Sequence, residues 1–145
     1  MNEVNRKEFT HLKIHTQYSI CEGALTIEEL AKYCKENKIR AIGLSDSGNL
    51  CGALEFSENI AKSKPQPIIG TQINILYKGQ VGKLPLFAKN LNGYKNLIKL
   101  SSKSFLEIKS NNEIPHCNIE DIEKHKEGLI LFTGTFDGLF GKLFF

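Results

Sequence analysis

The side chains best suited to chemistry fall in two short segments. His15 and Glu22 belong to residues 15–23, and Asp46 belongs to residues 45–50. Imidazole and carboxylate groups bind divalent metal ions and transfer protons, so these residue types allow either kind of chemistry. Each also has a structural alternative. His15 can be hydrogen-bonded to its neighbours at a strand end, and Asp46 can cap a turn through its own backbone.

The elements that must position these segments can be read from periodicity. Residues 9–15 alternate as a strand does. Thr26 with Glu29 is a capping box that begins a helix, and Asn37 lies where that helix should end. Residues 40–45 predict a short buried strand, followed by a second helix that Pro65 ends.

The second half of the chain continues this alternation. We expect strands at residues 68–77 and 84–89 joined by a turn at 78–80, a helix at 93–105, and a polar loop at 109–115. A short helix should begin at Asn118 with Asp121, before a buried strand at 128–133. The succession predicts an α/β fold with parallel strands, either part of a barrel or a doubly wound sheet. In both architectures the chemistry lies at the carboxyl ends of the strands, where residues 15–23 and 45–50 are expected.

Composition narrows the class of protein. The chain is 41% hydrophobic and 24% charged, with a net charge of +3 and no block of like charge, so no dense phosphate-binding stripe is visible. Its four cysteines form no C-x-x-C pair, which argues against a zinc knuckle. The apolar runs are too short to span a membrane, and residues 1–8 resemble no secretory signal. We expect a reduced, cytoplasmic protein with no membrane partner.

Five segments together resemble one family. Residues 9–19 continuing to Gly23, and residues 45–53, resemble the first two motifs of the PHP domain in the alpha subunits of bacterial DNA polymerase III. Residues 67–72, 88–100 and 127–130 are similar to later motifs, in the family's order and spacing. The resemblance divides the chain into a tail, residues 1–8, and the amino-terminal portion of a PHP domain, residues 9–145. The apolar carboxyl end of the sequence predicts a truncated domain.

The resemblance implies an α/β fold, part of a distorted (β/α)7 TIM-like barrel of PHP type. Active members of the family hold a cluster of metal ions that hydrolyses phosphoesters, including 3′ nucleotide ends. At the matching positions of this sequence the possible ligands are His15, Glu22 and Asp46. Four expected ligands are replaced, by Lys13, Ser47, Gln72 and Lys83. A lysine ammonium has no lone pair to donate and repels a cation.

A degenerate metal site is therefore expected, with His15, Glu22 and Asp46 as vestigial candidates and no cofactor in this segment. His11 lies two residues before Lys13 and is a poor substitute ligand. The resemblance implies a module that docks to the rest of the polymerase III alpha chain and to a proofreading exonuclease subunit. The parent polymerase would act on DNA with Mg²⁺. The alternative is a phosphoesterase or 3′–5′ exonuclease using Mn²⁺ or Zn²⁺ at this site.

Overall fold

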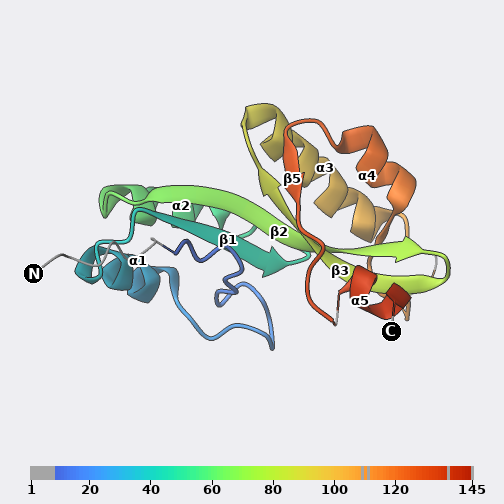
Figure 1. The fold of residues 1–145 in the computed structure, drawn as a ribbon, viewed down its shortest axis with the longest axis horizontal. Coiled ribbons are helices and arrows are strands. Elements are labelled where there is room, and N and C mark those ends of the chain that lie inside the picture. The colour runs from blue at the N-terminus through green and yellow to red at the C-terminus, as the bar shows by residue number, and fades with distance from the viewer. Residues whose placement is uncertain (1–8, 109, 111, 137, 145) are drawn as a thin grey trace, which may run out of the picture.

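A five-stranded mixed sheet runs through the molecule in the order β1-β2-β3-β5, with β4 beside β2 (Figure 1). The computed structural model describes residues 9–108, 110, 112–136 and 138–144, so the predicted tail at residues 1–8 lies outside the described residues. The strands are β1 (Ala41–Ser47), β2 (Gln66–Tyr77), β3 (Gln80–Ala88), β4 (Cys117–Asn118) and β5 (Leu129–Leu131). The helices are α1 (Ile27–Glu36), α2 (Ala53–Lys62), α3 (Leu91–Leu106), α4 (Ile119–His125) and α5 (Leu139–Phe144).

The sheet combines parallel and antiparallel pairs. β1 and β2 are parallel, with α2 as the crossover between them, and β2 and β3 form a long antiparallel hairpin. The predicted turn is confirmed: Lys78 and Gly79 have φ angles of 49° and 76°, as the two central residues of a tight hairpin turn require. β3 and β5 are also antiparallel, so the prediction of a parallel sheet holds only for the pairs that β2 makes with β1 and β4.

The prediction of a regular strand at residues 9–15 is wrong. This segment is extended and lies along β1, but only Gly43 N–H to His11 O (2.7 Å) and Ser45 N–H to Ile14 O (2.9 Å) bond it there. Between these two hydrogen bonds the chain advances by two residues along β1 but by three along the segment. This mismatch in spacing interrupts a regular ladder of hydrogen bonds. The approach is close, because a Cβ at Gly43 would lie 2.7 Å from the Leu12 carbonyl oxygen.

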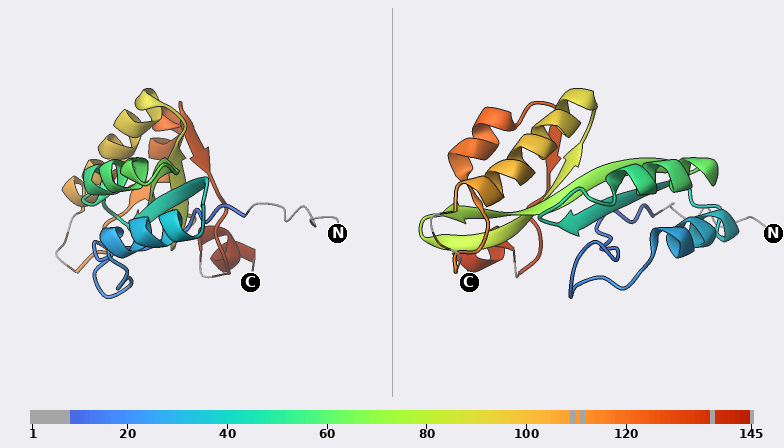
Figure 2. Two further views of the ribbon diagram at one scale, coloured as in Figure 1. Left: turned by 90° about the vertical axis from the view of Figure 1, so that its left-hand side faces the viewer. Right: turned by 180° about the vertical axis from the view of Figure 1, so that it is seen from behind.

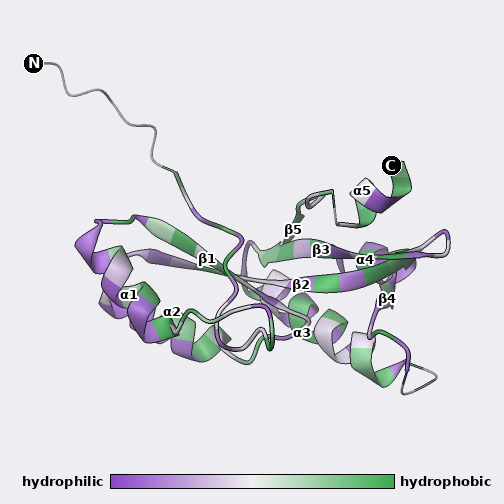
Figure 3. Cartoon of the chain, turned by 90° about the horizontal axis from the view of Figure 1, so that it is seen from below, coloured by the Kyte–Doolittle hydropathy of each residue, from purple (hydrophilic) through white to green (hydrophobic). Residues whose placement is uncertain are grey.

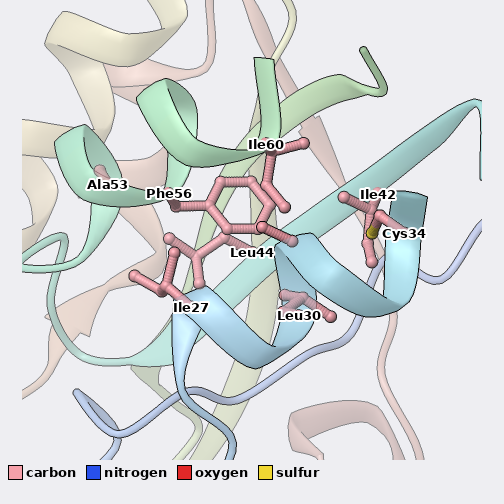
Figure 4. Packing of buried hydrophobic residues seen from close by; sticks show 9 residues of the cluster. Ile27, Leu30, Cys34, Ile42, Leu44, Ala53, Phe56 and Ile60 are labelled. Carbon is pink, nitrogen blue, oxygen red and sulfur yellow. The ribbon is translucent and has the colours of Figure 1, made fainter. Parts of the chain in front are cut away.

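Two hydrophobic clusters hold the fold, one on each side of the long hairpin's midpoint. In the first, α1 and α2 pack over β1 around the fully buried Phe56 (Figure 4). In the second, α3 and α4 pack on β2 and β3, as the view from behind shows (Figure 2). The predicted capping box at Thr26 is confirmed, and Asn118 forms another with Asp121, so both helices begin where the sequence predicts.

Three local features depart from what the sequence pattern favours. The inner face of α2 is formed by Ala53, Phe56 and Ile60, whereas the apolar Leu54 on the same helix is 70% exposed. The prediction of a buried strand at residues 128–133 is wrong, since β5 lies at the edge of the sheet and Ile130 is 45% exposed. The sequence pattern does not predict α5, which lies at the edge of the molecule in Figure 3; Leu139 is buried in the second cluster, whereas Phe144 is exposed. No helix within the described ranges is long and apolar enough to cross a membrane.

The packing of α2 gives a direct stability test. Phe56→Ala removes a fully buried ring from the first cluster, and we expect the free energy of unfolding to fall by about 3–5 kcal/mol. Leu54→Ala on the same helix removes a side chain that is mostly in solvent and should change it by less than about 0.5 kcal/mol. Urea unfolding followed by circular dichroism measures both. Equal decreases in the two variants would contradict this orientation of α2.

Candidate functional site

A polar pocket lies where β1 ends, beside the middle of the parallel strand β2. Ser47, the last residue of β1, is the register partner of Gln72 on β2. On β3, Pro85 is opposite Gln72 and Lys83 is opposite Asn74, so Lys83 lies diagonally across from Gln72 on the same face. The pocket has a volume of about 190 Å³, and the following residues line it: Lys13, His15, Glu22, Gln72, Lys83, Pro85, Gly134, Thr135 and Gly138.

Glu22 is the centre of the polar contacts in this pocket. One carboxylate oxygen, Oε1, accepts a short hydrogen bond from the ammonium group of Lys83. The other, Oε2, accepts one from the Ser47 hydroxyl at 2.5 Å, and Lys83 also donates to Ser47 Oγ at 3.1 Å. These hydrogen bonds hold the pKa of Glu22 below its ordinary value, with Lys83 the largest cause and Ser47 the next. The Glu22 carboxylate is therefore ionised at neutral pH.

His15 faces the same carboxylate but makes its close contact with Gln72. The amide nitrogen of Gln72 lies within hydrogen-bonding distance of His15 Nε2, and it also donates to the Ser45 carbonyl at 3.3 Å. An amide N–H is a donor only, so His15 Nε2 accepts, and the neutral ring carries its proton on Nδ1. His15 Nδ1 lies 3.4 Å from Glu22 Oε2. Burial lowers the pKa of His15 more than nearby Glu22 raises it, which favours this neutral form.

Asp46 lies apart from the pocket, on the other face of β1. Consecutive strand residues point to opposite faces, so Asp46 points away from Ser47. Asp46 is buried, with 1% of its surface exposed. Its carboxylate accepts hydrogen bonds from the Thr16 N–H (2.6 Å), the Thr16 hydroxyl (2.8 Å) and the Ser19 hydroxyl (2.6 Å). Asp46 thus ties residues 15–23 to β1. It does not cap its own turn; the side chain of Asn49 does, accepting from the Cys51 N–H at 3.0 Å.

The structure therefore divides the residues that the sequence singled out. It gathers Lys13, His15, Glu22, Gln72 and Lys83 around one pocket, with Ser47 bonded to Glu22. It separates Asp46 from them. It also leaves His11 exposed, with its ring against Phe9 rather than in the pocket.

Sequence reasoning missed Gly134, Thr135 and Gly138, which line one side of the pocket. Gly138 forms a bridge with Lys83 on β3, more than fifty positions earlier in the chain. Its neighbours in the sequence carry no ligand pattern that marks them as part of a site. Only the pairing of distant backbone segments brings them there.

The pairing of Lys83 with Glu22 has a measurable consequence for pH. Because the pKa of Glu22 is lowered in the fold, the pairing stabilises the protein above the ordinary pKa of glutamate, and this contribution disappears as the pH falls through the lowered value. Lys83→Met should raise the pKa of Glu22 toward its ordinary value, as measured by a carbon-detected NMR titration. Lys89→Met, just beyond the end of β3, is the control and should leave it unchanged. An unchanged Glu22 pKa in Lys83→Met would contradict the pairing.

Two solved structures share this fold. A putative metal-dependent phosphoesterase from Bifidobacterium adolescentis superposes with a TM-score of 0.50 at 15% identity, covering 66% of this chain and 34% of that one. An amidohydrolase from Chromobacterium violaceum, with bound sulfate and no metal, also gives a TM-score of 0.50, at 16% identity, and covers 63% of this chain and 32% of that one. These similarities support the predicted α/β architecture, part of a TIM-like barrel.

Sequence comparison gives the family. The DNA polymerase III alpha subunit of Rickettsia felis is 42% identical over 139 residues, which is 94% of this chain but 11% of that protein. The alpha subunit of Caulobacter vibrioides is 36% identical and covers 99% of this chain and 13% of its own length. The chain thus spans about a tenth of the length of these relatives. The profile of the PHP domain matches residues 11–145, and the chain belongs to the PHP domain family.

Proposed function

We propose that this chain is a non-catalytic PHP module of a bacterial replicative DNA polymerase, in which an internal ion pair replaces the metal site. The observation that carries the proposal is the contact of Lys83 with Glu22 and Ser47. The ammonium group of Lys83 lies against the carboxylate of Glu22, which a metal ion would need as a ligand. The similarity to polymerase III alpha subunits supports the choice of parent protein.

The side chains present do not fit a metal cluster. Within the described part of the chain, no group of three or more His, Cys, Asp or Glu side chains is placed to hold a metal ion. Both oxygens of Glu22 accept hydrogen bonds from Lys83 and Ser47, and both oxygens of Asp46 accept them from Thr16 and Ser19. His15 Nε2, the nitrogen that faces β2, is occupied by the Gln72 amide.

The activity of the whole polymerase belongs to other segments. In this proposal the parent protein is a cytoplasmic DNA-directed DNA polymerase, a nucleotidyltransferase that acts on DNA with Mg²⁺ in chromosomal replication. Its relatives are about eight to nine times longer than the segment they share with this chain. The residues described here contribute structure and a binding surface.

We further propose that the module docks to the polymerase core and to a proofreading exonuclease subunit. The exposed aromatic residues around α5 support a protein contact, because aromatic side chains are enriched at protein interfaces. Phe136, Phe140 and Phe144 line a hollow of about 320 Å³ beside Thr133 and Thr135. Lys13, exposed at the mouth of the polar pocket, offers a positive charge to a partner on the neighbouring face.

A second candidate is a metal-dependent phosphoesterase or 3′–5′ exonuclease with Mn²⁺ or Zn²⁺ held by His15, Glu22 and Asp46. It is favoured by the similarity of the fold to a putative metal-dependent phosphoesterase. It requires Lys83 to leave Glu22 and requires Asp46 to give up hydrogen bonds that hold residues 15–23 in place. Metal titration separates the two candidates.

Calorimetric titration with Mn²⁺ and Zn²⁺ should detect no binding to the native chain. The double variant Lys13→His with Ser47→His supplies two more ligands but keeps the ion pair between Lys83 and Glu22. We therefore expect no metal binding by this variant either. Adding Gln72→Glu and Lys83→His frees Glu22 and completes the donor set, and this quadruple variant should bind metal.

The titration has two informative failures. Tight binding of several ions by the native chain would overturn the proposal and favour the phosphoesterase. Binding by the double variant equal to that of the quadruple variant would show that Lys83 does not block the site. Thermal melting of each variant is the control for folding.

Docking is tested separately with the purified exonuclease subunit of the same organism. The full chain should bind it, as measured by co-elution and by calorimetry. Lys13→Glu should weaken the complex because it reverses a charge beside the polar pocket, whereas Lys78→Glu, at the distant β2–β3 turn, should not. Absence of binding by the native chain would contradict docking and leave the proposal of a replaced metal site standing.

A further inference from the structure

A second concave surface lies at the opposite end of the parallel strands from the polar pocket. Five cationic side chains surround it, and we call them the basic end: Lys35, Lys38, Arg40, Lys62 and Lys64. Cys34, Ile39 and Ser63 complete the lining of a hollow of about 740 Å³. β1 separates the two sites by roughly 20 Å, since a strand rises about 3.3 Å for each of its residues. This end lies at the left of Figure 3, where the loops are mostly purple.

The fold, rather than the sequence, assembles this surface. Lys35, Lys38 and Arg40 lie at or after the end of α1, and Lys62 and Lys64 lie at or after the end of α2. The parallel register of Ala41 with Gln66, and the hydrogen bond from the Gln66 N–H to the Arg40 carbonyl at 2.8 Å, place the two loops side by side. Each loop alone is an ordinary helix end with two or three charges.

The backbone at the two helix ends is an independent observation. Lys38 and Lys64 each lie one residue beyond a helix C-cap, with φ angles of 52° and 79°. Glycine is the usual residue in this left-handed position, because a Cβ is strained there. The helix dipole favours a positive charge in the last turn, which explains the presence of Lys35 and Lys62 there. It does not explain Lys38 or Lys64, because glycine would adopt their left-handed backbone conformation with less strain.

The four lysines of the basic end have no acidic side-chain partner within the described residues. No acidic side chain lines the hollow, and these lysines make no ion pair with the described part of the chain. Like charges brought together by a fold repel one another, and a bound polyanion relieves this repulsion. The surface is therefore electrostatically complementary to a series of negative charges.

We infer that the basic end binds the phosphodiester backbone of a nucleic acid. Lysine is depleted at protein–protein interfaces, whereas it supplies the sequence-independent phosphate contacts of proteins that bind nucleic acids. Four of the five cations here are lysines, and no aromatic residue lines the hollow. The inference concerns a surface apart from the polar pocket and holds whether or not that pocket binds metal.

The test is fluorescence anisotropy of the full chain with a labelled DNA oligonucleotide, single-stranded or duplex, over a range of salt concentrations. Affinity should fall as salt rises. In Lys38→Gly with Lys64→Gly, binding should weaken and the slope of log K against log salt should decrease by about 2, one for each phosphate that no longer meets a lysine. The melting temperature of this variant should rise, because glycine relieves the strain at both positions.

Lys78→Gly is the matched control. Lys78 has a φ angle of 49° at the β2–β3 turn, so the substitution removes one lysine charge and one strained position far from the basic end, where the test variant removes two of each. It should leave DNA affinity and the salt slope unchanged. Three results would overturn the inference: no DNA binding by the native chain, equal binding by Lys38→Gly with Lys64→Gly, or tighter binding of polyglutamate than of DNA at matched charge.

Discussion

The buried carboxylate of Asp46 is the contact on which the site depends. It lies near the end of β1 and receives three hydrogen bonds from Thr16 and Ser19. Each of these buried donors would cost about 1–3 kcal/mol if it were left without an acceptor. The carboxylate thereby fixes residues 15–23 against the sheet, and that segment carries both His15 and Glu22 into the polar pocket.

This role is compatible with the proposed replacement of a metal site by an ion pair, because the loop that carries His15 and Glu22 is held by Asp46 rather than by any ligand in the pocket. A metal ion and a lysine ammonium both supply positive charge beside a carboxylate, so Lys83 satisfies Glu22 as a cation would. The ammonium differs in that it cannot accept ligands or activate water. Under the proposed function, a lysine at this position keeps the positive charge that stabilises the loop but does not supply metal chemistry.

The parallel pair of β1 and β2 gives the molecule two ends with different chemistry. At the carboxyl ends, the extended segment and its following loop fold back and place polar side chains in a pocket. At the amino ends, two helices finish side by side and place their following lysines around a hollow. Both arrangements follow from a strand–helix–strand crossover, because it returns the chain to the same end of the sheet each time.

The sequence by itself determined where α1 and α4 begin and where the long hairpin turns, and it singled out most of the polar residues that line the pocket. The capping boxes at Thr26 and Asn118 and the tight turn at Lys78 depend on neighbouring residues, so pattern was sufficient to place them. Only the tertiary structure decided that Asp46 binds Thr16 and Ser19, that Gly134, Thr135 and Gly138 line the pocket, and that two loops form the basic end. The physical reason is that strand register and crossover geometry bring together residues far apart in the chain, and no local pattern encodes which distant backbone a strand will pair with.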